Sequence, residues 1–163
     1  MPPHLSVVPA DPAARAGRPV PVDLAETANQ AFAYAAGVLP PAVRVSSRGL
    51  DGPPRRIAVH PIELRRLIVT LLMRSAEAMD GTGVVTVALS DAVLDDPTAL
   101  RLGVPPGPYA VLNFADGVGP TVDRTTLTDI SALVARWRGA IAIEPGTSRR
   151  GRLAVYVPIA GQH

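Results

Sequence analysis

A long amphipathic segment between Pro61 and Met79 constrains the fold more than any other part of the sequence. Its apolar and small side chains recur every three or four residues, which is the spacing of one face of an α-helix: Leu64, Leu67, Ile68, Leu71, Leu72, Ser75 and Met79. Proline suits the first turn of a helix, so Pro61 marks the start. The helix is about 28 Å long at about 1.5 Å per residue. Its single apolar face requires a second structural layer to cover it.

The rest of the chain alternates between helix and strand patterns. Asp23 is placed to cap a helix that starts at Leu24 and stops at Gly37, and a third helix is expected over residues 124–138, with Trp137 facing inward. Alternating or β-branched runs predict strands over residues 43–46, 56–59, 84–89, 109–114, 140–144 and 152–158. Residues 90–108 are rich in Asp, Pro and Gly and are expected to form a loop.

These elements predict one α+β domain over residues 21–160. We expect a two-layer α/β sandwich, with a mixed or antiparallel sheet of about five strands and three helices on one face. Residues 1–20 are mostly Pro, Ala and small polar residues without a hydrophobic period, and we expect them to form a flexible arm.

Composition excludes several classes of function. The formal charge is only +2, from 16 basic residues (all arginine) against 14 acidic ones, and aromatic residues make up 4%, so a nucleic-acid interface is not expected. The chain has no cysteine and three scattered histidines, which argues against a metal site. Membrane association is not expected either, because no apolar run approaches the roughly 20 residues that span a bilayer. A cytoplasmic location is expected.

Taken in order, several pieces of the sequence resemble the ATP-binding catalytic domain of bacterial sensor histidine kinases, in the GHKL (Bergerat-fold) ATPase superfamily. The stretch 59–64 (VHPIEL) leads into 70–79 (TLLMRSAEAM), which is similar to the family's N box, N-L-x-x-N-A-x-x-A-M. Residues 105–119 resemble the strand and the glycine turn of the G1 box, D-x-G-x-G, and residues 138–159 resemble the terminal hairpin. The resemblance covers about residues 19–160.

The resemblance implies a nucleotide pocket, and the sequence departs from it at each determinant. Arg74 stands where the family's second N-box Asn supplies an oxygen to Mg²⁺, and a guanidinium has no lone pair to offer a metal. Thr70 stands at the first Asn. If Gly117 and Gly119 align with the two glycines of the G1 box, then Ala115 takes the place of the aspartate that binds adenine.

The residues after β-strand 109–114 also depart from the family pattern, both at the adenine-binding position and in the phosphate-binding lid. Asp116 comes one residue after the position of the adenine-binding aspartate. Only residues 120–123 lie between the turn and the next helix, where the family has a mobile ATP lid and a glycine motif. The resemblance therefore implies a remnant pocket of Thr70, Arg74, Asp116, Gly117 and Gly119, with no catalytic residue, no metal ligand and no cofactor.

The resemblance implies a protein-interaction module of two-component or phosphorelay signalling. Its partner would be a kinase helical hairpin or a receiver domain. Residues 1–20 are too short to hold the phosphoacceptor hairpin, and none of His4, His60 and His163 lies within a predicted helix. The alternative function is an ATP-binding domain in which Arg74 replaces the metal ion. A third is a sensor that binds an anion or a small molecule in the vacated pocket.

Two of these residues have simpler interpretations. Arg66, Thr70 and Arg74 form an i, i+4, i+8 line, which suits Arg74 to hold a phosphate, but Glu77 three residues further on offers it an intrahelical ion pair. Gly117 and Gly119 suit a phosphate-binding turn, but a tight turn after a strand uses glycine for positive φ in any case.

Overall fold

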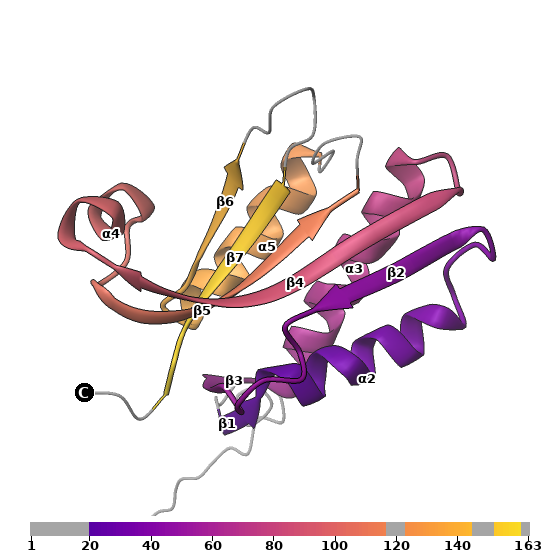
Figure 1. Ribbon diagram of the computed structural model, residues 1–163. Helices are drawn as coiled ribbons and strands as arrows, with labels where there is room; N and C mark the ends of the chain where they lie inside the picture. Colours follow the sequence, from indigo (N-terminus) through magenta and orange to yellow (C-terminus); the bar gives the residue numbers. More distant parts are fainter. Residues whose placement is uncertain (1–19, 117–122, 145–151, 161–163) are drawn as a thin grey trace, which may run out of the picture.

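The computed structural model describes residues 20–116, 123–144 and 152–160, and this part of the chain forms four helices and seven strands (Figure 1). In chain order the elements are β1 (Val20–Asp23), α2 (Leu24–Ala36), β2 (Val43–Arg48), β3 (Arg56–Val59), α3 (Pro61–Ala78), β4 (Gly83–Leu94), α4 (Asp96–Leu102), β5 (Gly107–Ala115), α5 (Arg124–Arg136), β6 (Ala140–Glu144) and β7 (Arg152–Pro158). No helix in the described ranges has both the length and the hydropathy to cross a membrane.

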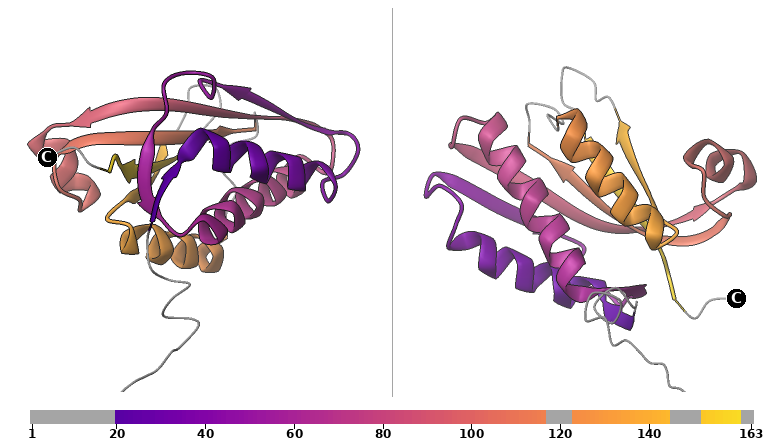
Figure 2. Two further views of the ribbon diagram at one scale, coloured as in Figure 1. Left: turned by 90° about the horizontal axis from the view of Figure 1, so that it is seen from below. Right: turned by 180° about the vertical axis from the view of Figure 1, so that it is seen from behind.

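Five strands form a mixed sheet in the order β2-β4-β5-β7-β6. Strands β2 and β4 are parallel, and all other neighbours are antiparallel. Helices α2, α3 and α5 lie beside one another across one face of this sheet (Figure 2). The predicted two-layer sandwich, with three helices on one face of a five-stranded mixed sheet, is confirmed.

The apolar stripe of α3 forms the centre of the core. Leu64, Ile68 and Leu72 are completely buried, as are Val85 and Val87 on the inner face of β4. Each buried side chain of this size contributes about 1.5–3 kcal/mol relative to an exposed one. The packing of α3 on the sheet therefore makes a large contribution to the stability of the domain.

A separate two-stranded ribbon of β1 and β3 brings the starts of α2 and α3 together. The strands pair antiparallel from Val20 opposite Val59 to Asp23 opposite Arg56. The predicted cap of α2 is confirmed, because Asp23 Oδ1 accepts a hydrogen bond from the amide of Ala25 at 3.1 Å. The two helices consequently leave the ribbon close together and pack against each other along the sheet.

The loop predicted over residues 90–108 is wrong. Strand β4 continues to Leu94, and a fourth helix, α4, precedes β5. Asp95 caps α4 by accepting a hydrogen bond from the amide of Thr98 at 2.9 Å, and Gly103 ends it in the left-handed conformation. The Asp and Gly residues that suggested a loop therefore include the two caps of a short helix.

Helix α4 lies apart from the other three helices, at the far end of the β4–β5 ribbon (Figure 1). A second, smaller apolar cluster of Leu94, Ala99 and Tyr109 holds it there. The hydroxyl of Tyr109 donates a hydrogen bond to the carbonyl oxygen of Pro105 at 2.7 Å. The ribbon extension is thus a packed part of the fold.

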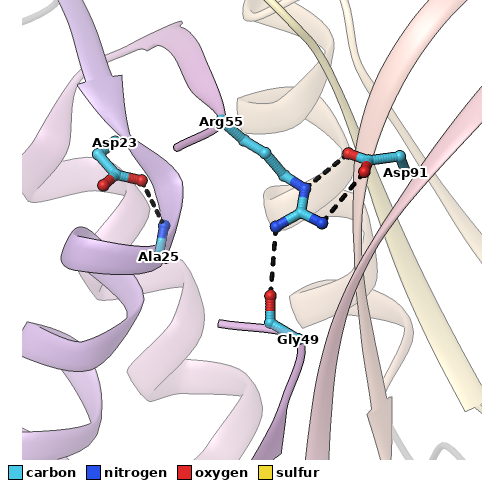
Figure 3. Close-up of polar contacts among 5 residues, drawn as sticks. All are labelled: Asp23, Ala25, Gly49, Arg55 and Asp91. Atoms are coloured by element: carbon cyan, nitrogen blue, oxygen red, sulfur yellow. Dashed lines mark hydrogen bonds and ion pairs between the residues drawn. The ribbon is translucent and has the colours of Figure 1, made fainter. Parts of the chain in front are cut away.

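Arg55 fastens the connection between β2 and β3 to β4. Its guanidinium donates two hydrogen bonds to the carboxylate of Asp91, at 2.6 and 3.1 Å, and a third to the carbonyl oxygen of Gly49 at 3.2 Å (Figure 3). The Arg55 side chain is only 13% exposed. These hydrogen bonds lower the pKa of Asp91 below its usual value.

The backbone at Gly49 passes too close to β4 for any side chain. A Cβ atom at residue 49 would lie 2.1 Å from the carbonyl oxygen of Leu89, and φ is +77°. Gly103 has nearly the same φ, +75°, but open space around its Cβ position. Alanine substitutions at the two glycines therefore distinguish the free-energy cost of the left-handed backbone conformation from the cost of the steric contact with β4.

We expect Gly103→Ala to lower the free energy of unfolding by about 1–2 kcal/mol, the cost of a left-handed residue with a Cβ atom. Gly49→Ala should cost at least about 2 kcal/mol more, because the backbone of β4 must also shift. Urea denaturation of both variants measures the difference. Equal costs would contradict the close approach of residue 49 to β4.

Candidate functional site

Helices α3 and α5 run antiparallel and are joined by an ion pair at each end. At one end, Arg136 Nη2 of α5 lies 3.0 Å from Glu63 Oε1 near the start of α3. At the other, Arg74 Nε in the C-terminal half of α3 lies 3.9 Å from Oδ1 of Asp123, which precedes α5. The second pair is at the end of α3 that carries the N-box-like sequence.

Arg74 is held by two carboxylates. Its Nη1 donates a hydrogen bond to Glu77 Oε2 at 3.0 Å, and its Nε faces Asp123. The intrahelical pair with Glu77 that the sequence suggested is present. The Arg74 side chain is 41% exposed, so solvent screens both contacts and each of them is weak. Together they neutralise the guanidinium and give it a preferred direction, toward the start of α5.

The carboxylate of Asp123 has two roles. While Oδ1 faces Arg74, Oδ2 accepts a hydrogen bond from the backbone amide of Thr126 at 3.1 Å and so caps α5. A helix N-terminus and an arginine both attract anionic ligands. One side chain of the protein itself occupies both.

The surroundings of Asp123 keep it ionised. Hydrogen bonds from Thr126, through its side chain and its backbone amide, lower the pKa of Asp123, and the positive charge of Arg74 lowers it further. The side-chain cap and the ion pair therefore persist across the neutral pH range. They weaken only when the carboxyl group becomes protonated in acid.

The structure separates the other predicted site residues. Thr70 lines a groove between α3 and α2 rather than the space between α3 and α5. Asp116 directly follows β5 and is half-buried. Gly117 and Gly119 lie outside the described residues. Ala115, which the resemblance places at the position of the family's adenine-binding aspartate, is the last residue of β5 and pairs with Thr86 of β4.

Sequence reasoning missed Asp123. An aspartate directly before a helical pattern is a typical N-cap, so the sequence contained the signal for its role on α5. Its approach to Arg74 had no such signal, because it depends on how α3 and α5 lie on the sheet.

Several solved structures of histidine kinases and their ATP-binding domains are similar to this chain. The ATP-binding domain of PrrB from Mycobacterium tuberculosis is 16% identical, with a TM-score of 0.63 over 88% of this chain and 98% of that one. The mycobacterial sensor histidine kinase MprB is 15% identical, with a TM-score of 0.62 over 86% of this chain and 97% of that one. No protein-family model matches the chain.

The chain has the fold of a histidine-kinase ATP-binding catalytic domain. The resemblance seen in the sequence is thus confirmed at the level of the fold. A third similar structure is the histidine kinase ThkA, solved in complex with the response regulator protein TrrA. It is 10% identical, with a TM-score of 0.59 over 87% of this chain and 42% of that one.

We expect the stability conferred by Asp123 to depend on pH. Because the pKa of Asp123 is lowered in the folded protein, its contribution is present above the ordinary value of 3.8 and is lost as the pH falls through the folded-state pKa. The asparagine side chain in Asp123→Asn would still cap α5 but would not titrate. The difference in free energy of unfolding between the wild type and this variant should therefore be largest at neutral pH and shrink in acid.

Urea denaturation followed by the fluorescence of Trp137, the single tryptophan, measures this difference. Trp137 lies at the end of α5 and is 7% exposed, so it reports on the unfolding of this helix. The matched control is Asp129→Asn, which removes a carboxylate of α5 that caps nothing. A difference between wild type and Asp123→Asn that is independent of pH would contradict the role given to the charge.

Proposed function

We propose that this chain is a histidine-kinase-type ATPase fold that has lost ATP binding and serves as a protein-interaction module in two-component signalling. The observation that carries the proposal is the carboxylate of Asp123, which faces Arg74 and caps α5. An incoming triphosphate would have to displace this carboxylate from both groups. Glu77, which also pairs with Arg74, would repel it as well.

The residues present do not fit Mg-ATP. Arg74 stands at the position that the resemblance assigns to a metal ligand, and its positive charge disfavours a divalent cation beside it. Ala115 stands at the adenine position, and its methyl group accepts no hydrogen bond. The metal ion, the phosphates and the adenine base of Mg-ATP would each lack a contact that the family pattern provides. In the described ranges, no cluster of three or more His, Asp or Glu side chains is arranged to hold a metal ion.

A domain that has lost its ligand can still bind other proteins through its surface. ThkA, which shares this fold, was solved in complex with a response regulator. We propose a partner of the same signalling class for this chain, either a receiver domain or the helical hairpin of a kinase. This proposal accounts for the loss of pocket chemistry alongside an intact two-layer core.

We expect no binding of ATP or ADP in calorimetric and thermal-shift titrations to millimolar nucleotide, with or without Mg²⁺. A ligand at about 100 times its Kd adds about 2.7 kcal/mol of stability, so binding would be detected readily. The ATP-binding domain of PrrB is the positive control. Binding that requires Mg²⁺ would contradict the proposal.

The alternative, in which Arg74 replaces the metal ion, has a separate signature. It requires nucleotide binding that persists in a chelator and disappears in Arg74→Ala. The interaction half of the proposal is tested by adding the chain to a reconstituted kinase and receiver pair and measuring phosphotransfer. We expect inhibition together with direct binding to one component. Absence of binding to either component would overturn this half.

A further inference from the structure

The outer face of α2 and α3, away from the sheet, exposes an unusual concentration of apolar side chains. Tyr34 is 65% exposed, Val38 45%, Ile62 51% and Met73 42%. They are half of the eight large apolar residues that are exposed in the described part of the chain. Single exposed apolar residues are ordinary, but a contiguous patch on a small domain is typical of an interface.

These side chains line two adjoining hollows along the helix pair. One, of about 410 Å³, lies between α2 and the N-terminal half of α3 and includes Tyr34 and Ile62. The other, of about 400 Å³, lies at the C-terminal ends of the same helices and includes Val38 and Met73. The residues of α3 that line the two hollows recur every three or four positions from Ile62 to Asp80, so the hollows follow one another along one stripe of the helix over roughly 27 Å. We refer to them together as the α2–α3 groove.

The two ends of this groove carry opposite charges. Arg65 and Arg66 line the end near the start of α3, and both are exposed. Glu77 and Asp80 line the other end. Glu77 is already paired with Arg74, but no ion pair joins Arg65, Arg66 or Asp80 to another residue within the described ranges, so these three charges are available to a partner.

A groove with one basic and one acidic end is complementary to itself. A two-fold axis through the middle of the groove and perpendicular to it places Arg65 and Arg66 of each copy opposite Glu77 and Asp80 of the other. The same axis makes the helices of the two copies antiparallel. Each helix N-terminus then lies near a helix C-terminus of the partner, which the helix dipoles favour.

We propose that the α2–α3 groove joins two copies of this chain in a symmetric, antiparallel four-helix interface. Tyr34 and Met73 would lie near its apolar centre, Ile62 would lie at its two ends, and the charged side chains would set its register. Arg74 and Asp123 do not line the groove, but Glu77 does and also pairs with Arg74, so the acidic end of the groove borders the candidate site.

Charge reversal gives a sharp test by sedimentation equilibrium of the full chain. The wild type should self-associate to a dimer. Arg65→Glu with Arg66→Glu makes both ends of the groove acidic, and Glu77→Arg with Asp80→Asn makes both ends basic. Asparagine suits residue 80, where φ is +55°. Each double variant alone should dimerise about tenfold or more weakly, because every charge pair occurs twice in the symmetric dimer.

An equimolar mixture of the two double variants should restore the dimer as a heterodimer. Restoration also shows that both variants are folded. The matched control for the Arg65 and Arg66 variant is Arg44→Glu with Arg48→Glu, which makes the same change in net charge on the exposed edge strand β2 and should leave dimerisation unchanged.

Three results would overturn the proposal. The first is a wild type that stays monomeric at all concentrations. The second is a dimer that the reversals at the groove do not weaken. The third is two weakened variants that fail to pair when mixed, although circular dichroism shows that both are folded.

Discussion

The carboxylate of Asp123 joins the two helices that border the candidate site, α3 and α5. It lies between a guanidinium on α3 and the N-terminal amides of α5, and it satisfies one group from each. We propose that the space between α3 and α5 corresponds to the nucleotide pocket that the resemblance to histidine kinases implies. Here the protein supplies the anion itself. In the proposed function, Arg74 stands in place of the N-box metal ligand, and the carboxylate of Asp123 takes the place of a phosphate.

The ion pairs alone do not place α5. The side chains of Arg74 and Asp123 are 41% and 53% exposed, so solvent screens most of their attraction. Burial of Ile130, Val134 and Trp137 contributes more, at about 1.5–3 kcal/mol for each large apolar side chain. The apolar contacts therefore hold α5 on the sheet. The contacts of Asp123 with Arg74 and of Arg136 with Glu63 then determine which polar side chains of α3 and α5 face each other.

Most of the fold could be predicted from the sequence, because α3 and the strands have clear hydrophobic periods. Helix α4 was missed because it is short. Its signals were the caps, Asp95 and Gly103, within a stretch whose composition suggested a loop. At the candidate site, the Arg74–Glu77 pair followed from helical spacing. The approach of Asp123 to Arg74 depends on tertiary packing, so the sequence could not predict it. Helical periodicity also cannot tell which neighbouring helix a side chain faces, and so it did not predict that Thr70 lines the groove beside α2.

The most direct test of the central claim is a residue-resolved titration of the ¹⁵N-labelled chain with ATP, in Mg²⁺ and then in a chelator. If Asp123 already satisfies the anion-binding groups, the amide signals of Arg74, Asp123 and Thr126 should not move at millimolar nucleotide. The Arg74 side-chain Nε–H signal should also stay in place. Saturable shifts at these residues would contradict the claim, and shifts that need Mg²⁺ would show that the space between α3 and α5 still binds metal and nucleotide together.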